Sequence, residues 1–115
     1  MPDIGEYFGD VVFAYTDAQA VADGVLVDIG GWGLQFRGRP VNRMTRTVWV
    51  ELEPYAYIGV QAGRYRDVAE SLRHMVATKL RHSGEAGGDV MKVPPRYWLL
   101  ENETGGWTLM APEDY

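Results

Sequence analysis

Apolar residues recur at helical spacing between Tyr65 and His82, which is the clearest pattern in the chain. The recurring positions are Val68, Leu72, Met75, Val76 and Leu80. Residues three and four apart share one face of a helix, so these side chains form a single apolar stripe. We therefore predict a helix over this segment that packs on a core and is ended by Ser83 and Gly84.

The segment from Val41 to Glu53 fits two periods. With period two, one strand face carries Met44, Arg46, Val48, Val50 and Leu52. With a helical period after a Thr45 cap, the apolar stripe consists of Val48, Trp49 and Leu52. We favour the helix, and we expect Pro54 to end the element in either case because proline lacks the amide donor.

The amino-terminal third combines turn signals with short apolar runs. Residues 10–15 are β-branched and aromatic, so we expect an extended segment. Thr16 and Gln19 have the spacing of a capping box, and a short helix after them would end at Gly24 in a left-handed conformation. Residues 25–29 read as a strand, and the glycine-rich residues 30–40 read as a loop.

Three short segments near the carboxyl end alternate with turn residues. They are residues 89–93, 96–102 and 107–110, separated by Pro94-Pro95 and by Thr104-Gly105-Gly106. Helices followed by a hairpin predict an α+β fold, with helices packed on a small antiparallel sheet that has a C-terminal hairpin. The length of 115 residues suits a single domain covering 1–115.

Charge is distributed unevenly along a chain whose net charge is −5. Residues 1–36 hold six acids and no lysine or arginine, residues 37–82 hold nine bases and four acids, and residues 83–115 hold six acids and two bases. Either the acidic ends fold over the basic middle and pair with it, or an acidic face meets a basic partner. An acidic protein lacks the basic footprint of a general nucleic-acid binder.

The composition predicts a cytoplasmic protein without cofactors. No cysteine is present, which excludes disulfides, thiolate metal sites and a cysteine nucleophile. The acidic start is unlike a signal peptide, and no apolar run is long enough to cross a membrane. The two histidines, His74 and His82, are eight residues apart on one expected helix and would project too far apart to chelate one metal. We therefore expect neither a metal nor a cofactor.

No catalytic motif stands out. The glycines of residues 30–38 do not form a nucleotide-binding pattern, and neither serine lies in a nucleophile motif. Glu51 and Glu53 are close in sequence, but they would need a folded cleft to act as an acid–base pair. We therefore expect a protein that binds another macromolecule and is not an enzyme.

Two groups of residues are candidates for contacting a partner. The first interleaves aromatic and basic side chains: Trp32, Phe36, Arg37 and Arg39, continued by Arg43 and Arg46. Such a mixture suits a protein hot spot or stacking on single-stranded nucleic acid, unless the aromatics belong to the core and the arginines are solvated. The second group is acidic and lies near the two ends: Asp3, Glu6, Glu113 and Asp114.

The chain also resembles a family of uncharacterised short proteins that phages and plasmids encode. The resemblance rests first on a Tyr-Thr-x-x-Gln-Ala-x-x-Asp-Gly-Val-Leu-Val-Asp motif, which spans residues 15–28. Looser counterparts are Pro40-Val41, Thr45, Val48-Trp49, residues 63–68 and residues 107–114. The blurred Gly-Phe position and the Gly- and Arg-rich residues 30–39 depart from the family pattern.

The resemblance implies a mobile-element setting and carries no catalytic residues. Small acidic proteins in that setting often block host nucleases, as anti-CRISPR and anti-restriction proteins do. The expected function is therefore inhibition of a host-defence nuclease complex by protein contact, with a nuclease or CRISPR effector subunit as partner and no direct contact with nucleic acid or membrane. The alternative is a nucleic-acid-associated protein or small enzyme of phage or plasmid upkeep that uses Arg37–Arg46.

Overall fold

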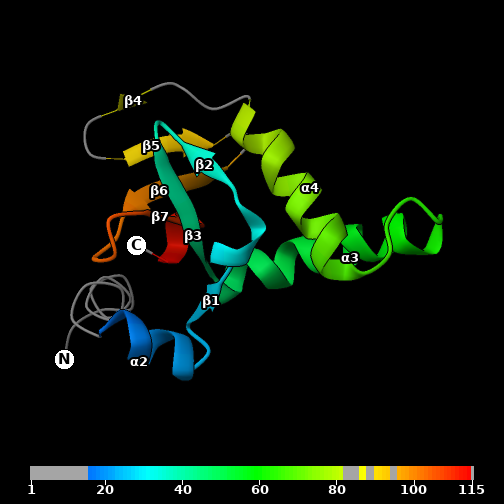
Figure 1. Ribbon diagram of the computed structural model, residues 1–115, viewed down its shortest axis with the longest axis horizontal. Helices are drawn as coiled ribbons and strands as arrows, with labels where there is room; N and C mark the ends of the chain where they lie inside the picture. Colours follow the sequence, from blue (N-terminus) through cyan, green and yellow to red (C-terminus); the bar gives the residue numbers. More distant parts are fainter. Residues whose placement is uncertain (1–15, 82–85, 88–89, 94–95, 115) are drawn as a thin grey trace.

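A mixed sheet forms the body of the protein in the computed structural model, which describes residues 16–81, 86–87, 90–93 and 96–114 (Figure 1). The described strands are β1 (Leu26–Asp28), β2 (Gln35–Phe36), β3 (Arg39–Thr45), β4 (Ala86–Gly87), β5 (Val90–Val93), β6 (Tyr97–Glu101) and β7 (Trp107–Met110). Their order is β1-β3-β7-β6-β5-β4, and β2 pairs with β3 beside this path. The described helices are α2 (Asp17–Ala22), α3 (Arg46–Gln61) and α4 (Val68–Arg81), with 3-10 turns η1 (Gly30–Trp32) and η2 (Pro112–Asp114).

The α+β class is confirmed, and so is the C-terminal hairpin. Strands β6 and β7 pair antiparallel, with Leu99 opposite Leu109. The sheet is mixed, however, because β3 and β7 run parallel, with Met44 opposite Leu109. A parallel pair needs a long crossover connection, and here α3, α4 and the strands β4 to β6 all lie between the two strands in sequence.

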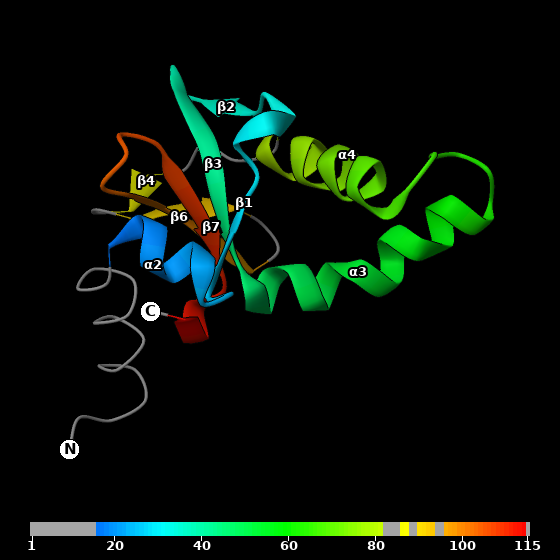
Figure 2. The same ribbon diagram turned by 60° about the horizontal axis from the view of Figure 1, so that its bottom comes forward.

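The two long helices pack as a hairpin against one face of the sheet (Figures 1 and 2). Helix α3 contributes Val48, Leu52 and Ala56 to the core, and α4 contributes Leu72, Val76 and Leu80. The sheet contributes Val41, Met44, Leu99 and Leu109. The stripe of α4 is thus confirmed. Alternation along β6 and β7 directs Leu100 and Met110 to the other face, where they are also buried.

The segment over residues 41–53 is part strand and part helix. Strand β3 ends at Thr45, whose backbone is extended with φ −69° and ψ 152°, and α3 begins at the next residue. The prediction that Pro54 ends this element is wrong, because α3 continues through Pro54 to Gln61. A proline at this position removes the hydrogen bond to the carbonyl of Val50. Both residues lie on the exposed side of the helix, where water can replace that bond.

Helix α2 confirms the predicted capping box. Thr16 Oγ1 accepts a 3.1 Å hydrogen bond from the Gln19 amide, and Gln19 Oε1 accepts a 3.3 Å bond from the Thr16 amide. Gly24 follows with φ +77°, the left-handed conformation expected of it. The chain then enters β1 as predicted. The extended segment expected over residues 10–15 lies outside the described residues.

Helix α4 is shorter at its start than the predicted 65–82. It begins at Val68 because Asp67 acts as its cap, with Asp67 Oδ1 accepting a 2.8 Å hydrogen bond from the Glu70 amide. The loop between α3 and α4 turns at Gly63, which has φ +75°. Within the part of the chain that the structure describes, no helix is long and apolar enough to span a membrane.

Candidate functional site

The aromatic side chains of the arginine–aromatic segment pack against the core. Trp32 lies against Trp49 with ring centroids 6.1 Å apart, and both rings are half-buried. Phe36 meets Trp107 edge to face at 5.7 Å, and Trp107 Nε1 donates a 2.9 Å hydrogen bond to the Phe36 carbonyl. Trp32 and Phe36 therefore hold the irregular segment before β3 on the body of the protein, and most of their surface is not available to a partner.

The arginines of this segment lie in different parts of the folded protein. Arg37 and Arg39 are exposed at the turn between β2 and β3, where Arg37 has φ 52° and lies over the Phe36 ring. Arg39 forms a 2.6 Å ion pair with Glu101 and lies over the ring of Trp107. The predicted cluster of arginines and aromatics is thus not one surface. Arg37 and Arg39 face solvent at the turn between β2 and β3, and Arg46 does so separately at the start of α3.

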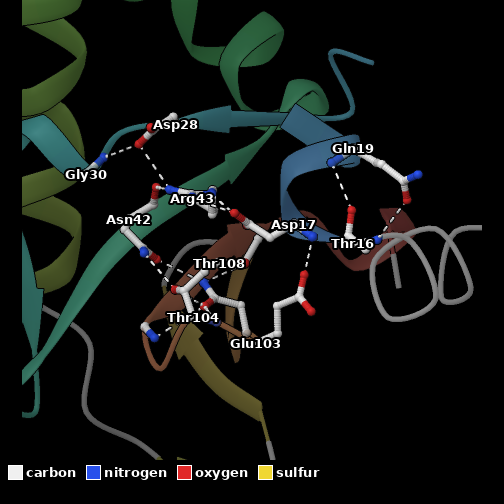
Figure 3. A network of polar contacts seen from close by, with 12 residues as sticks. Thr16, Asp17, Gln19, Asp28, Gly30, Asn42, Arg43, Glu103, Thr104 and Thr108 are labelled. Carbon is white, nitrogen blue, oxygen red and sulfur yellow. Dashed lines mark hydrogen bonds and ion pairs between the residues drawn. The ribbon is translucent and has the colours of Figure 1, made fainter. Parts of the chain in front are cut away.

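Arg43 lies at the centre of a polar network that joins α2 to β1 and β3 (Figure 3). Its Nε and Nη2 donate to the two carboxylate oxygens of Asp17 at 2.7 and 2.5 Å, and its Nη1 donates to Asp28 Oδ1 at 3.0 Å. The hydrogen bonds from Arg43 to Asp17 raise the pKa of the arginine, although burial opposes them. Asp28 Oδ1 also accepts a hydrogen bond from the Gly30 amide.

A second part of the network ties β3 to the turn between β6 and β7 (Figure 3). Asn102 Nδ2 donates to Asn42 Oδ1 at 3.0 Å, while Asn42 Nδ2 donates to Thr104 Oγ1 at 2.8 Å. Gly106 lies directly beside β3, since a Cβ built on it would be 2.6 Å from the Pro40 carbonyl oxygen. Every polar group of this turn that is named here already has a partner, so we interpret the turn as structural.

Several described residues of the family-like motif take part in these contacts, while Tyr15 lies outside the described residues. Thr16 and Gln19 cap α2, Ala20 is buried, Gly24 supplies a left-handed turn, and Asp28 binds Arg43. In addition, the Asp17 amide donates a hydrogen bond to Glu103, which joins α2 to the turn between β6 and β7 (Figure 3). The structure thus gives these motif residues a role in holding the fold together.

Four acidic residues near the two ends were expected to contact a partner, and the structure describes two of them, Glu113 and Asp114. Asp3 and Glu6 lie outside the described residues. Glu113 is exposed and binds Arg96; hydrogen bonding within its own backbone turn and this arginine lower the pKa of the carboxyl. Asp114 requires a correction, since it is only 3% exposed and accepts hydrogen bonds from Thr45 and Thr47 at 2.6 and 2.7 Å. Its carboxylate is buried against the start of α3 and is not part of an exposed acidic surface.

The two glutamates considered as an acid–base pair point to different neighbours. Glu51 accepts hydrogen bonds from Arg96 and from the Tyr97 hydroxyl, at 2.8 and 3.2 Å. Glu53 accepts a 2.7 Å bond from Trp49 Nε1. Burial, followed by the nearby Glu51 charge, raises the pKa of Tyr97 to about 12, so its hydroxyl stays protonated at neutral pH. We find no acid–base pair in this arrangement.

A small groove lies between the irregular segment before β3 and the end of α4. It has a volume of about 260 Å³ and is lined by Gly33, Leu34, Gln35, Ala77, Leu80 and Arg81. One charged side chain and no converging set of polar groups reach it, which is unlike a substrate site. Among the described residues, no three His, Asp or Glu side chains are placed to hold a metal ion.

The outer face of α3 carries an apolar surface that the sequence reading missed. Val50, Tyr57 and Ile58 are 59%, 53% and 61% exposed, and Pro54 is exposed between them. At helical spacing they line the side opposite Val48, Leu52 and Ala56, and Tyr55, 64% exposed, lies at its flank. We call Val50, Pro54, Tyr55, Tyr57 and Ile58 the α3 face. The spacing of 50, 54, 57 and 58 was visible in the sequence, but ending the helix at Pro54 hid it.

The α3 face is the part of the described surface best suited to binding. Monomeric proteins rarely leave several large apolar side chains together in water, and such patches mark interaction sites. Tyrosine is enriched at interfaces because it combines a large apolar ring with a polar tip. Figures 1 and 2 show that α3 extends away from the sheet beyond the other described elements.

The assignment of the α3 face as a binding surface rests on the structure of this chain alone, because comparisons with known proteins found no match. No family model, no curated protein and no solved structure matches the sequence or the fold.

Proposed function

We propose that the protein is a non-enzymatic binding protein that acts by direct contact with another protein through the α3 face. The supporting observation is that the outer side of α3 exposes Val50, Tyr55, Tyr57 and Ile58 by more than half of their surface. The same helix buries Val48, Leu52 and Ala56 on its other side. One helix is therefore apolar on two sides, and only one side is needed for the fold.

The proposed setting is a mobile genetic element. The resemblance of residues 15–28 to short phage and plasmid proteins supports it. We propose that the partner belongs to a host-defence nuclease complex, which the protein would inhibit in the manner of anti-CRISPR or anti-restriction proteins. Inhibition by contact requires no catalytic group, which agrees with side chains that are occupied in the polar networks around Arg43 and Asp114.

A nucleic-acid-associated role in phage or plasmid upkeep remains the alternative, and one observation favours it. Arg37 and Arg39 are exposed together at the turn between β2 and β3, over the half-buried ring of Phe36 and the buried ring of Trp107. Binding through this turn would depend strongly on salt, because arginine contacts to phosphate release counterions.

A capture experiment with three matched proteins tests the proposal. Tagged wild type, Tyr57→Ser with Ile58→Asp, and the control Ala18→Asp on exposed α2 would be incubated with bacterial host lysate and the captured proteins identified by mass spectrometry. We expect wild type and the control to hold the same protein and the α3 variant to lose it, since hot-spot truncations cost about 2 kcal/mol or more. Circular dichroism would verify that all three are folded.

The alternative is tested in the same experiment. Arg37→Glu with Arg39→Glu should leave protein capture unchanged under our proposal. If this variant abolished a salt-sensitive affinity for nucleic acid while the α3 variant bound as wild type does, the proposal would fail in favour of the upkeep role.

A further inference from the structure

The α3 face has the dimensions of a helix that inserts into a groove. Val50 and Ile58 are eight residues apart, or about 12 Å along the helix axis, with Pro54 and Tyr57 between them on the same side. Anchors at such spacing are what helix-in-groove recognition uses. The opposite side of α3 packs on the core through Val48, Leu52 and Ala56. The helix is therefore already ordered, and a partner would not have to fold it.

Two arginines mark the ends of the α3 face. Arg46 is the first residue of α3 and is exposed, and Arg64 is exposed in the loop after its end. Arg46 Nε donates a 3.4 Å hydrogen bond to the Gly24 carbonyl, and in the described part of the chain neither guanidinium forms an ion pair with a carboxylate. They stand at opposite ends of α3, whose 16 residues span about 24 Å.

The charged residues around the α3 face favour some classes of partner over others. The apolar positions of the α3 face carry no charge. Two carboxylates of α3 flank them: Glu51, which is bound to Arg96 and Tyr97, and Glu53, which is bound to Trp49. Nucleic acid is a poor fit, because its phosphates repeat along the whole groove or strand and would meet apolar side chains and these carboxylates. A protein groove with charge only at its borders fits this pattern better.

A second copy of the chain is also a poor fit. Two α3 faces packed antiparallel would bring Arg46 of one copy near Arg64 of the other, and parallel packing would bring each arginine near its own counterpart. Either arrangement places like charges together at the borders of an apolar contact, which is unfavourable. The arginines instead complement carboxylates.

We propose that the α3 face inserts into an apolar groove on a protein partner and that carboxylates border this groove at both ends. The proposal rests on the proposed function, since it specifies the chemistry of the protein that the α3 face contacts. The apolar centre supplies the affinity, while Arg46 and Arg64 fix the direction of α3 in the groove and speed its association.

Site-specific photocrosslinking identifies what lies against the α3 face. The photoreactive residue p-benzoylphenylalanine would replace Tyr57 in one variant, Val50 in a second and Ala18 in a control. After irradiation in host lysate, mass spectrometry would identify the crosslinked peptides. We expect positions 50 and 57 to crosslink one protein, through apolar peptides with Asp or Glu nearby in that protein's structure, and we expect position 18 not to do so. A crosslink to a basic surface, to nucleic acid or to a second copy of this chain would overturn the inference.

Charge reversal tests the role of the two arginines with the partner so identified. Association of the purified partner with Arg46→Glu/Arg64→Glu would be compared with that of Arg37→Glu/Arg81→Glu, a control with the same change in net charge. We expect at least a tenfold lower association rate for the first pair, a smaller change for the control, and an intermediate effect for Arg46→Gln/Arg64→Gln. Circular dichroism would show that each variant is folded.

The two possible failures are distinguishable. The photoreactive residue at position 57 could crosslink a protein that the Arg46→Glu/Arg64→Glu variant still binds at the wild-type rate. In that case the inference of an acidic groove is wrong and the proposed function stands. If no protein is captured and none crosslinks at position 50 or 57, both are wrong.

Discussion

The hydroxyl of Thr45 donates a 2.6 Å hydrogen bond to the carboxylate of Asp114 in a buried contact between residues 69 positions apart. Thr45 is the residue at which β3 ends and α3 begins, and its side chain makes no capping bond to its own helix. Asp114 also accepts hydrogen bonds from the Thr47 hydroxyl and from the Ala111 amide, so it ties the side chains at the start of α3 to the last described turn. The final turn of the described chain therefore fixes the start of α3.

Removing this carboxylate should destabilise the protein substantially. Asp114→Ala leaves the hydroxyls of Thr45 and Thr47 and the Ala111 amide without their acceptor. Each buried group left unpaired costs about 1–3 kcal/mol. We expect a loss of about 3 kcal/mol in the free energy of unfolding, measured by urea titration. Glu113→Ala is the control, since an exposed ion pair contributes about 0–1 kcal/mol. Equal losses for the two variants would contradict the role given to Asp114.

The stability that the contact between Arg43 and Asp17 provides should depend on the planar shape of the guanidinium. Both side chains are largely buried, with 13% and 16% exposed, and the contact uses two parallel hydrogen bonds. Lysine keeps the charge but cannot form this fork, so we expect Arg43→Lys to lose about 1–2 kcal/mol of stability. A double-mutant cycle with Asp17→Asn measures the coupling, which should exceed about 1 kcal/mol. A coupling near zero would show that the pair holds α2 only weakly.

The close approach of Gly106 to β3 should not tolerate a methyl group. A Cβ at this position would be 2.5 Å from Asn42 Oδ1 and 2.6 Å from the Pro40 carbonyl oxygen, and the backbone of β3 cannot move away cheaply. We expect Gly106→Ala to cost about 1–3 kcal/mol, as overpacking does. Gly31→Ala is the matched control, because a Cβ there meets nothing within 4 Å, and its effect should stay within about 0.5 kcal/mol. Thermal unfolding of the two variants would decide the matter.

The cap of α4 should make stability depend on pH in the acidic range. The hydrogen bond from the Glu70 amide, helped by Arg66, lowers the pKa of Asp67 below its usual 3.8. A lowered pKa in the folded state means that the contribution is present above pH 3.8 and is lost as the pH falls through the folded value. Asp67→Asn keeps a neutral cap, so the stability gap between it and wild type should be largest at neutral pH and should close on acidification.

This gap would be followed by urea unfolding at several pH values between 7 and about 2.5. A gap that stayed constant over this range would show that the ionised form of Asp67 is not what stabilises α4.

Features that depend on neighbouring residues were predictable from the sequence. The capping box of Thr16 and Gln19 and the left-handed Gly24 involve residues a few positions apart, so their side chains and backbone determine the outcome. The stripe of α4 follows equally from its spacing. These predictions needed no knowledge of the rest of the chain.

Features that depend on distant contacts were not predictable in this way. Residues 41–53 fit both periods because β3 takes the first part and α3 the second, and the change occurs at Thr45, whose side chain is held by the distant Asp114. Pro54 was expected to end the helix, although the exposed side of α3 accommodates it. Asp114 was expected to contact a partner because acidic residues gather near the two ends of the sequence, but its buried partners are 67 and 69 residues away.

The parallel pairing of β3 with β7 also dictates when the protein can fold during its synthesis. Strand β7 is the last described strand to leave the ribosome, yet it lies in the middle of the sheet between β3 and β6. Until β7 emerges, the edges of β3 and β6 that it covers have no partner, and open strand edges can pair with other chains. A protease that cut the turn between β6 and β7 would leave β7 held only by its non-covalent contacts with β3 and β6, and its loss would remove a central strand.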